Sequence, residues 1–151
     1  MTSFSVRSMH EADLDAVLAV AASLKEAPQW PRAAYAVALD SQNSPPRVCL
    51  VAEVEGEVVG FVVASVLSPD AELESIAVAA TAQRRGVGAF LLGELVRELR
   101  NEGVTALLLE LRASNYQAFA FYEQAGFARV GVRRAYYQNP PEDALLLKFI
   151  F

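Results

Sequence analysis

Two glycines stand close together after a short apolar segment, and two arginines precede them. The run is Gln83-Arg84-Arg85-Gly86-Val87-Gly88, and residues 76–78 before it read Ile-Ala-Val. Glycine lets the backbone approach a ligand closely, and the free N–H groups at a helix start attract an anion. The arginine side chains add positive charge. The run therefore predicts a strand, an anion-binding loop and a helix start that together suit a pyrophosphate.

Two common nucleotide-binding loops are excluded by the residues around these glycines. The chain has no Gly-Lys-Ser or Gly-Lys-Thr triplet, so it has no Walker loop. A Rossmann fingerprint needs a further glycine at the position of Leu91. A Gly-x-Gly pair alone is more typical of a simple tight turn, so its interpretation as a ligand site depends on motifs elsewhere in the chain.

Hydrophobic periodicity places this loop between a strand and a helix of a mixed α/β fold. Ser114 or Asn115 is expected to cap the last helix, and Gly103 to end the third. The order β-α-α-β-β-β-α-β-α-β-β combines antiparallel hairpins with parallel crossovers, so we expect one mixed sheet with helices on both faces. The expected strands are residues 4–9, 47–54, 57–67, 73–78, 106–111, 129–137 and 144–151, and the expected helices are residues 11–23, 31–40, 87–102 and 115–124.

Length and composition limit the class of protein. The 151 residues suit one domain, residues 1–151, and 54% of them are apolar. The apolar run 58–67 is about half of the ~20 residues that a membrane helix needs, so it predicts a buried strand and no membrane partner. Acidic residues at positions 11, 13 and 15 interrupt what would be a secretory pattern, so we expect a cytoplasmic protein.

The residue types offer little for metal, thiol or nucleic-acid chemistry. The chain has one histidine, His10, and one cysteine, Cys49, so we expect no metal site and no histidine-based catalytic pair. Cys49 lies in an apolar run and is expected to be a core residue in a reducing compartment. The net charge of −5 argues against nucleic acid as a partner.

Four further strings accompany the glycine loop: Leu109-Glu110-Leu111-Arg112-Ala113-Ser114-Asn115, Phe121-Tyr122-Glu123-Gln124-Ala125-Gly126-Phe127, Arg133-Arg134-Ala135-Tyr136-Tyr137 and Glu142-Asp143-Ala144. With these strings the chain resembles the GNAT acetyltransferase superfamily, whose diphosphate loop reads Arg/Gln-x-x-Gly-x-Gly/Ala. Within it, the chain is similar to the N-terminal acetyltransferase branch, which includes the bacterial ribosomal-protein-alanine N-acetyltransferases. The resemblance covers nearly the whole chain. It implies a single-domain mixed sheet of six to seven strands flanked by about four helices.

The resemblance also implies acetyl-CoA as co-substrate, without a metal, and gives roles to particular positions. The implied contacts to the pantetheine arm are the backbones of Ile76, Ala77 and Val78, the implied diphosphate site is Arg84, Arg85, Gly86, Val87, Gly88 and Ala89, and Asn115 is a further implied contact. Two positions depart from the family pattern. Its Asp-Pro after the fourth strand is Ala79-Ala80 here, and its Asn before Tyr-Tyr is Ala135, near the implied peptide groove.

The resemblance makes Glu110 the general base and Tyr122 the general acid. Attack of an amine on a thioester needs a neutral amine and a proton for the departing thiolate. An α-amine has a pKa of roughly 7.7–8.0, so one carboxylate acting directly or through water suffices. Glu110 ends an apolar run, and partial burial there suits a proton acceptor. Glu74 is the alternative base, because another branch of the superfamily places its glutamate on the fourth strand.

Aromatic residues from two parts of the chain are candidates for the acceptor groove. Tyr136 and Tyr137 match the pair that borders the peptide N-terminus in the family, and Trp30 and Tyr35 are expected either to form a second wall or to lie in the core. The expected acceptor is the N-terminal amine of a protein or peptide, such as a ribosomal protein that begins with alanine. Two alternatives stay open: a small-molecule amine as acceptor, and a non-catalytic acyl-CoA-binding module. The sequence indicates no oligomeric state.

Overall fold

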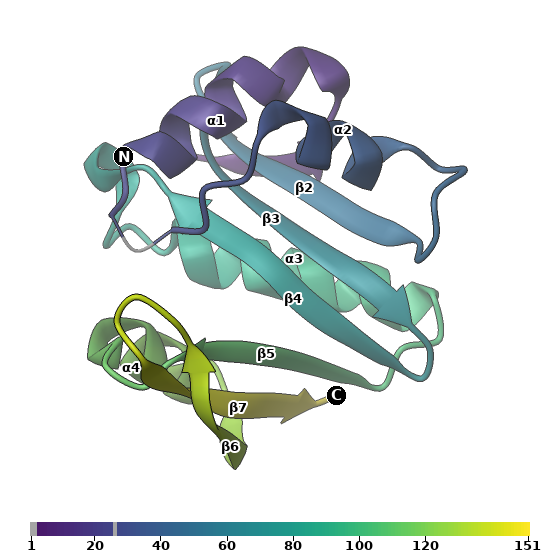
Figure 1. The fold of residues 1–151 in the computed structure, drawn as a ribbon. Coiled ribbons are helices and arrows are strands. Elements are labelled where there is room, and N and C mark those ends of the chain that lie inside the picture. The colour runs from purple at the N-terminus through teal and green to yellow at the C-terminus, as the bar shows by residue number, and fades with distance from the viewer. Residues whose placement is uncertain (1–2, 26) are drawn as a thin grey trace.

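The computed structural model describes residues 3–25 and 27–151, and these form one seven-stranded sheet flanked by helices (Figure 1). The expected order of elements is confirmed. The strands are β1 (Ser5–Ser8), β2 (Arg47–Val54), β3 (Glu57–Leu67), β4 (Asp70–Val78), β5 (Ala106–Arg112), β6 (Ala128–Tyr137) and β7 (Glu142–Ile150). The α-helices are α1 (Leu14–Ala22), α2 (Arg32–Leu39), α3 (Val87–Asn101) and α4 (Tyr116–Gln124), with short 3-10 turns η1 (Glu11–Asp13) and η2 (Ala80–Ala82).

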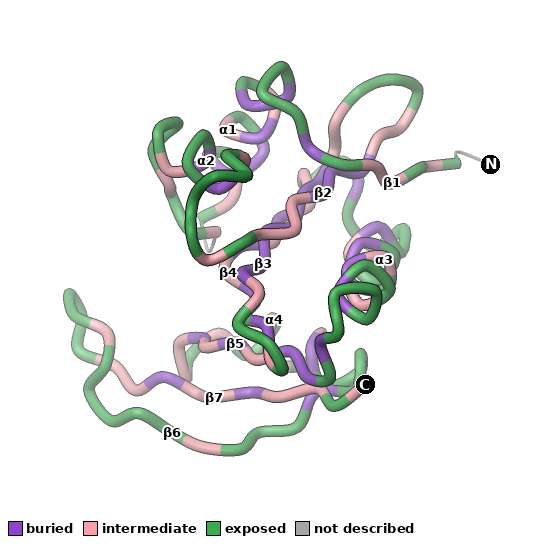
Figure 2. The backbone as a smooth tube through the Cα atoms, turned by 90° about the vertical axis from the view of Figure 1, so that its right-hand side faces the viewer, coloured by how far each residue is buried: buried purple, intermediate pink, exposed green. Residues whose placement is uncertain are grey.

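Helices cover both faces of the sheet, but one face only in part (Figures 1 and 2). One core cluster packs the sheet against α3 and α4 and includes Leu95 and Leu107. A second cluster packs β2, β3 and β4 against α1 and α2 and includes Val17 and Phe61. The second cluster takes no residue from β5, β6 or β7 among the described residues. We call this uncovered side of β5, β7 and β6 the open face.

The sheet divides between β4 and β5, and this division creates the space for a site. The two strands pair in parallel only through residues 70–72 and 106–108, and then they diverge (Figure 1). A β-bulge follows at once in β4, because its register against β3 passes from Leu73 to Ser75 with Glu74 as the extra residue. Leu73 belongs to the first cluster, whereas Ala77 belongs to the second. The bulge therefore places Leu73 and Ala77 on opposite faces of the sheet, although they lie four residues apart. It lies next to the edge of β4 that no longer pairs with β5.

The strand order is β1-β2-β3-β4-β5-β7-β6, so the last strand lies between two earlier ones. β7 is antiparallel to both β5 and β6, and it brings the β6–β7 hairpin next to the end of β5. Cross-strand partners share one face of a sheet. Ala144 of β7 is the partner both of Arg112 in β5 and of Arg133 in β6, so both arginines project from the same face.

The element ends differ from the sequence-based expectations in several places, and β4, for example, begins at Asp70 rather than at residue 73. Pro31 is the residue before α2 rather than its first residue, with an extended ψ of 157°. The first helix begins with the 3-10 turn because the Asp13 carboxylate accepts a hydrogen bond from the His10 backbone N–H at 2.8 Å. Gly103 ends α3 as expected: its φ is +82°, and the Gly103 and Val104 N–H groups donate to Arg100 and Leu99. No helix in the described ranges has the length and apolar character that crossing a membrane requires.

Candidate active site

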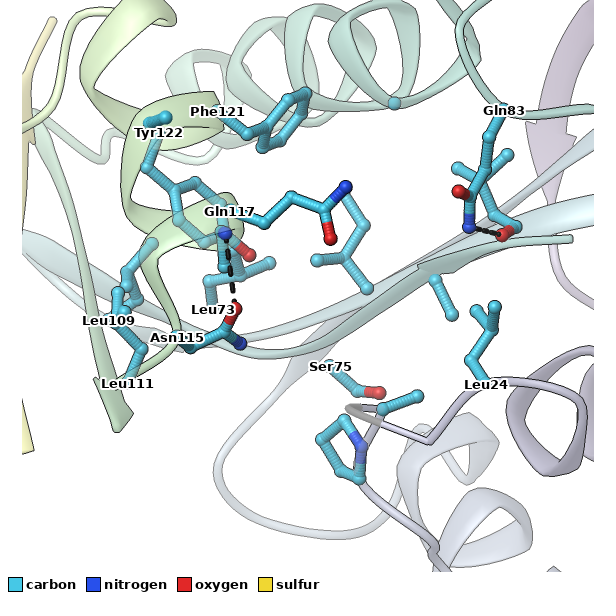
Figure 3. A pocket seen from close by; sticks show the side chains of 18 of the residues that line it. Leu24, Leu73, Ser75, Gln83, Leu109, Leu111, Asn115, Gln117, Phe121 and Tyr122 are labelled. Atoms are coloured by element: carbon cyan, nitrogen blue, oxygen red, sulfur yellow. Dashed lines mark hydrogen bonds between the residues drawn. The ribbon is translucent and has the colours of Figure 1, made fainter. Parts of the chain in front are cut away.

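A cavity of about 1150 Å³ opens where β4 and β5 diverge (Figure 3). Its walls come from β4, the β4–α3 loop, the end of β5, α4 and the segment before α2. The sequence-predicted residues that line it are Ile76, Ala77, Val78, Arg84, Gly86, Val87, Gly88, Ala89, Glu110, Asn115, Tyr122 and Tyr137, together with the alternative base Glu74. Three predicted residues do not line it: Arg85, Trp30 and Tyr136.

The β4–α3 loop has the backbone geometry of an anion site. Arg84 has a φ of +63° and Gly86 a φ of +82°, so the loop contains two left-handed residues with Arg85 between them. Successive N–H groups in such a conformation point into a shared concavity. The first helical bond of α3 runs from Phe90 N–H to Gly86 O at 3.0 Å, which leaves the N–H groups of residues 87–89 without intrahelical acceptors. The Gln83 amide ties this loop to β4, because its Nε2 donates to Val78 O at 2.9 Å (Figure 3).

Gly88 serves a packing role as well as lining the cavity. A Cβ built at Gly88 would lie 3.1 Å from Cζ and 3.3 Å from Cε1 of Phe121, on α4. Side-chain carbons rarely approach so closely. The absence of a side chain at Gly88 therefore allows the Phe121 ring to pack against the first turn of α3. The sequence alone did not reveal this second requirement.

Helix α4 carries Asn115 and Tyr122 to the cavity. Asn115 is the N-cap, as expected, and its Oδ1 accepts from Ala118 N–H at 3.2 Å (Figure 3). The Tyr122 side chain is buried, and its ring lies 5.2 Å from that of Phe121 and 5.4 Å from that of Phe127. Burial raises the pKa of the Tyr122 phenol well above its ordinary value. The phenol is therefore protonated at neutral pH.

Glu110 lines the same cavity from β5. It alternates along the strand with Leu109 and Leu111, which belong to the first core cluster, so its side chain projects from the open face. The Glu110 carboxylate is 24% exposed and its Oε1 lies 3.6 Å from Nη2 of Arg133. Burial and then the negative charge of Glu110 raise the pKa of both Glu72 and Tyr137. These two side chains therefore lie within electrostatic reach of Glu110.

The alternative base Glu74 is already engaged by a cation. Its Oε1 accepts from Nε of Arg47 at 2.8 Å and its Oε2 accepts from Nη2 of the same residue at 3.4 Å. Both side chains are about one-fifth exposed. This two-point contact with a guanidinium engages both oxygens of the Glu74 carboxylate. Glu74 is therefore the weaker candidate for a base in this geometry.

Arg112 connects β5 to the β6–β7 hairpin, and sequence reasoning did not identify this role. Its guanidinium lies 4.4 Å from the centre of the Tyr137 ring, and its Nη2 donates to Gln138 O at 3.4 Å. Its Nη1 also lies 3.3 Å from Oε1 of Glu142, whose other carboxylate oxygen accepts from Ser114 N–H. These contacts hold the Tyr137 ring at the edge of the cavity. Arg112 could have been suspected only from its place two residues after Glu110.

The expected aromatic wall from Trp30 and Tyr35 is not formed. Tyr35 is fully buried in the second cluster, where its ring contacts Phe61, and Trp30 packs on Tyr35 with ring centres 5.1 Å apart. These residues fill the space between α2 and the sheet. Tyr136 is 48% exposed and packs edge-to-face on Tyr137, outside the lining of the cavity.

Polar groups elsewhere around the cavity do not form a metal site. The described residues contain no cluster of three or more His, Cys, Asp or Glu side chains that could hold an ion.

Ser75 is a lining residue that sequence reasoning missed, and its buried hydroxyl has no hydrogen-bond partner among the described residues (Figure 3). Burial raises the pKa of the Cys49 thiol to about 11, which makes it a poor nucleophile.

Comparison with known proteins places this geometry in a family. Residues 14–127 match the acetyltransferase (GNAT) family. The [ribosomal protein bS18]-alanine N-acetyltransferase of Escherichia coli K12 is 42% identical over 94 residues, which cover 61% of this chain and 64% of that enzyme. The crystal structure of the E. coli ribosomal-protein-S18-alanine N-acetyltransferase matches with a TM-score of 0.84 and 31% identity, over 98% of this chain and 94% of the other. Ard1 from Thermoplasma volcanium matches with a TM-score of 0.83 and 27% identity, over 97% of both chains. The chain therefore belongs to the GNAT family of acetyltransferases.

Proposed function

We propose that the protein is an acetyl-CoA-dependent N-acetyltransferase whose acceptor is the N-terminal α-amine of a protein. The observation that carries this proposal is that Glu110, Tyr122 and the anion-binding loop all line one cavity. A module that only binds acyl-CoA would need the loop but neither of the other two groups. The E. coli relatives, named for acetylating the alanine of a ribosomal protein, favour an acceptor that begins with alanine.

The proposed binding of acetyl-CoA uses backbone more than side chains. The N–H groups of residues 87–89 and the Arg84 side chain receive the diphosphate, and the unpaired edge of β4 at residues 76–78 pairs with the pantetheine arm. Anions are stabilised at a helix N-terminus by the free N–H groups and by the helix dipole. Asn115 adds a polar contact from the start of α4.

The proposed chemistry is a direct attack within a ternary complex. Glu110 accepts a proton from the attacking amine, directly or through a water molecule. The amine nitrogen forms a bond with the thioester carbonyl carbon, the carbon–sulfur bond breaks, and Tyr122 donates its proton to the departing thiolate. Glu110 rather than Glu74 is assigned as the base, because Arg47 already binds Glu74 at two points.

Matched substitutions test the assignment of the base and the acid. Glu110→Gln should lower kcat by ~10²–10⁴, the usual contribution of a positioned proton acceptor, while calorimetry shows acetyl-CoA binding unchanged. Tyr122→Phe should also slow turnover. Raising the pH should partly rescue only the Glu110 variant, because more of the amine is then neutral. Glu74→Gln is the control and should keep most of the activity. A damaging Glu74→Gln beside a harmless Glu110→Gln would reverse the assignment.

The acceptor is tested with three amines under the same conditions. These are an alanine-starting peptide, its N-blocked counterpart that contains lysine, and spermidine. Lysine, with a pKa of about 10.4, has ~10²–10³-fold less neutral amine at neutral pH than an α-amine. The alanine-starting peptide should therefore be acetylated fastest. Better turnover of spermidine would replace the protein acceptor with a small amine and leave the chemistry in place.

A further inference from the structure

Arg133 contacts Glu110 on the open face of the sheet, the face from which the proposed acceptor approaches. The anion-binding loop and Asn115 belong to α3 and α4, on one face of the sheet, whereas Glu110 projects from the open face. The register β5–β7–β6 places Arg133 on this open face too, directly across Ala144 from Arg112. Its Nη2 lies 3.6 Å from Glu110 Oε1. The guanidinium therefore stands on the acceptor side of the proposed base.

The Arg133 side chain is held loosely in this position. It is 55% exposed, and its guanidinium lies 5.4 Å from the centre of the exposed Tyr136 ring. The same charge also acts on Glu72, whose pKa it lowers against the larger effects of burial and of Glu110. Arg133 is thus a largely exposed cation near two carboxylates, those of Glu110 and Glu72. An exposed ion pair with a single long contact contributes little stability.

We propose that Arg133 is a built-in competitor of the acceptor, occupying on Glu110 the position that a protonated acceptor amine takes. The proposal rests on the role of Glu110 in the proposed function. An α-amine is still largely protonated near pH 7 and arrives as a cation. Two cations cannot share one carboxylate oxygen at close range without repulsion, so the incoming ammonium displaces the guanidinium. Acceptors without a cationic amine lack the charge to do so, and Arg133 thereby disfavours their entry.

The test compares Arg133→Ala with Arg134→Ala, because Arg134 is the adjacent arginine of the same strand and is also exposed. Steady-state rates are measured with the alanine-starting peptide at saturating acetyl-CoA. Arg133→Ala should lower the KM for the peptide about two- to fivefold, as expected for loss of a weak exposed ion pair, with kcat little changed. Arg134→Ala should change neither. In Arg133→Ala, methylguanidinium should inhibit competitively against the peptide, and more strongly than in the wild type.

Three results would overturn the proposal. They are an unchanged or raised KM in Arg133→Ala, the same KM change in Arg134→Ala, and methylguanidinium inhibition equal to that of the wild type. A fall in kcat with unchanged KM would instead make Arg133 a positioning residue for Glu110. If the wild type acetylates spermidine faster than the peptide, the proposal of a protein acceptor is wrong. Spermidine is also a cation, so the KM values of Arg133→Ala and Arg134→Ala for spermidine then decide the role of Arg133.

Discussion

Two glycines of α3 allow the packing requirement at Gly88 to be measured separately from helix propensity. Gly88 and Gly93 both lie in α3, and replacing glycine by alanine in a helix gains at most about 1 kcal/mol at either position. A Cβ at Gly93 would meet no atom within 4 Å, whereas one at Gly88 would lie 3.1 Å from Phe121. Inserting a carbon into such a tight contact costs about 1–3 kcal/mol. Gly93→Ala should therefore stabilise the protein, and Gly88→Ala should be less stable than Gly93→Ala by about 1–3 kcal/mol.

Urea and thermal unfolding of the two variants measure this difference. For a chain of this size, each 1 kcal/mol shifts Tm by about 2–4 °C. Gly93→Ala should bind acetyl-CoA as the wild type does, because Gly93 is exposed and remote from the cavity lining. Gly88→Ala should also weaken acetyl-CoA binding, because displacing Phe121 moves a wall of the cavity. Equal stabilisation by both substitutions would show that the Phe121 ring yields freely and would refute the packing argument.

Three other substitutions test features of the fold and of the edge of the cavity. Hydrogen bonds from Arg7 lower the pKa of the Asp13 carboxyl from 3.8 to about 2. The contribution of the ionised carboxylate to the free energy of unfolding is therefore complete above pH 4 and is lost as the pH falls towards 2. Asp13→Asn should cost about 1–3 kcal/mol at pH 7, and its unfolding free energy should converge with that of the wild type in acid. Ala135 has a φ of +51°, which asparagine tolerates better, so Ala135→Asn should raise stability by up to about 1 kcal/mol in urea unfolding. Arg112→Lys keeps the charge but loses the planar stack on Tyr137, and it should raise the KM for the peptide several-fold while acetyl-CoA binding stays unchanged.

The positive φ of Ala135 gives a physical reason for the asparagine that the family pattern has at this position. Ala135 lies in the irregular stretch of β6 between Arg133 and Tyr137, where the register against β7 shifts. Its N–H donates to Asp143 Oδ1 at 2.8 Å, which helps to hold the irregular backbone. This left-handed residue directly precedes the Tyr136–Tyr137 pair, and the Tyr137 ring contacts Arg112 at the end of β5. The asparagine that the family carries at this position suits that backbone conformation.

Local sequence signals determined the order of the elements and some of the helix ends. Glycine at position 103 and asparagine at position 115 predicted helix ends correctly, because capping depends on residues within one turn. The Gly86 loop was recognisable for the same reason. The resemblance to a known family implied the roles that we propose for Glu110 and Tyr122, and the structure brings both side chains to one cavity.

Only the tertiary structure decided how distant segments meet. The short parallel pairing of β4 with β5, the bulge at Glu74 and the insertion of β7 between β5 and β6 depend on register between strands far apart in the chain. Tyr35 and Tyr137 are both tyrosines within a helix or a strand, yet one is fully buried and the other lines the cavity. Periodicity shows which side of its own strand or helix a residue occupies. It contains no information on what packs against that side, because that is fixed by contacts between elements.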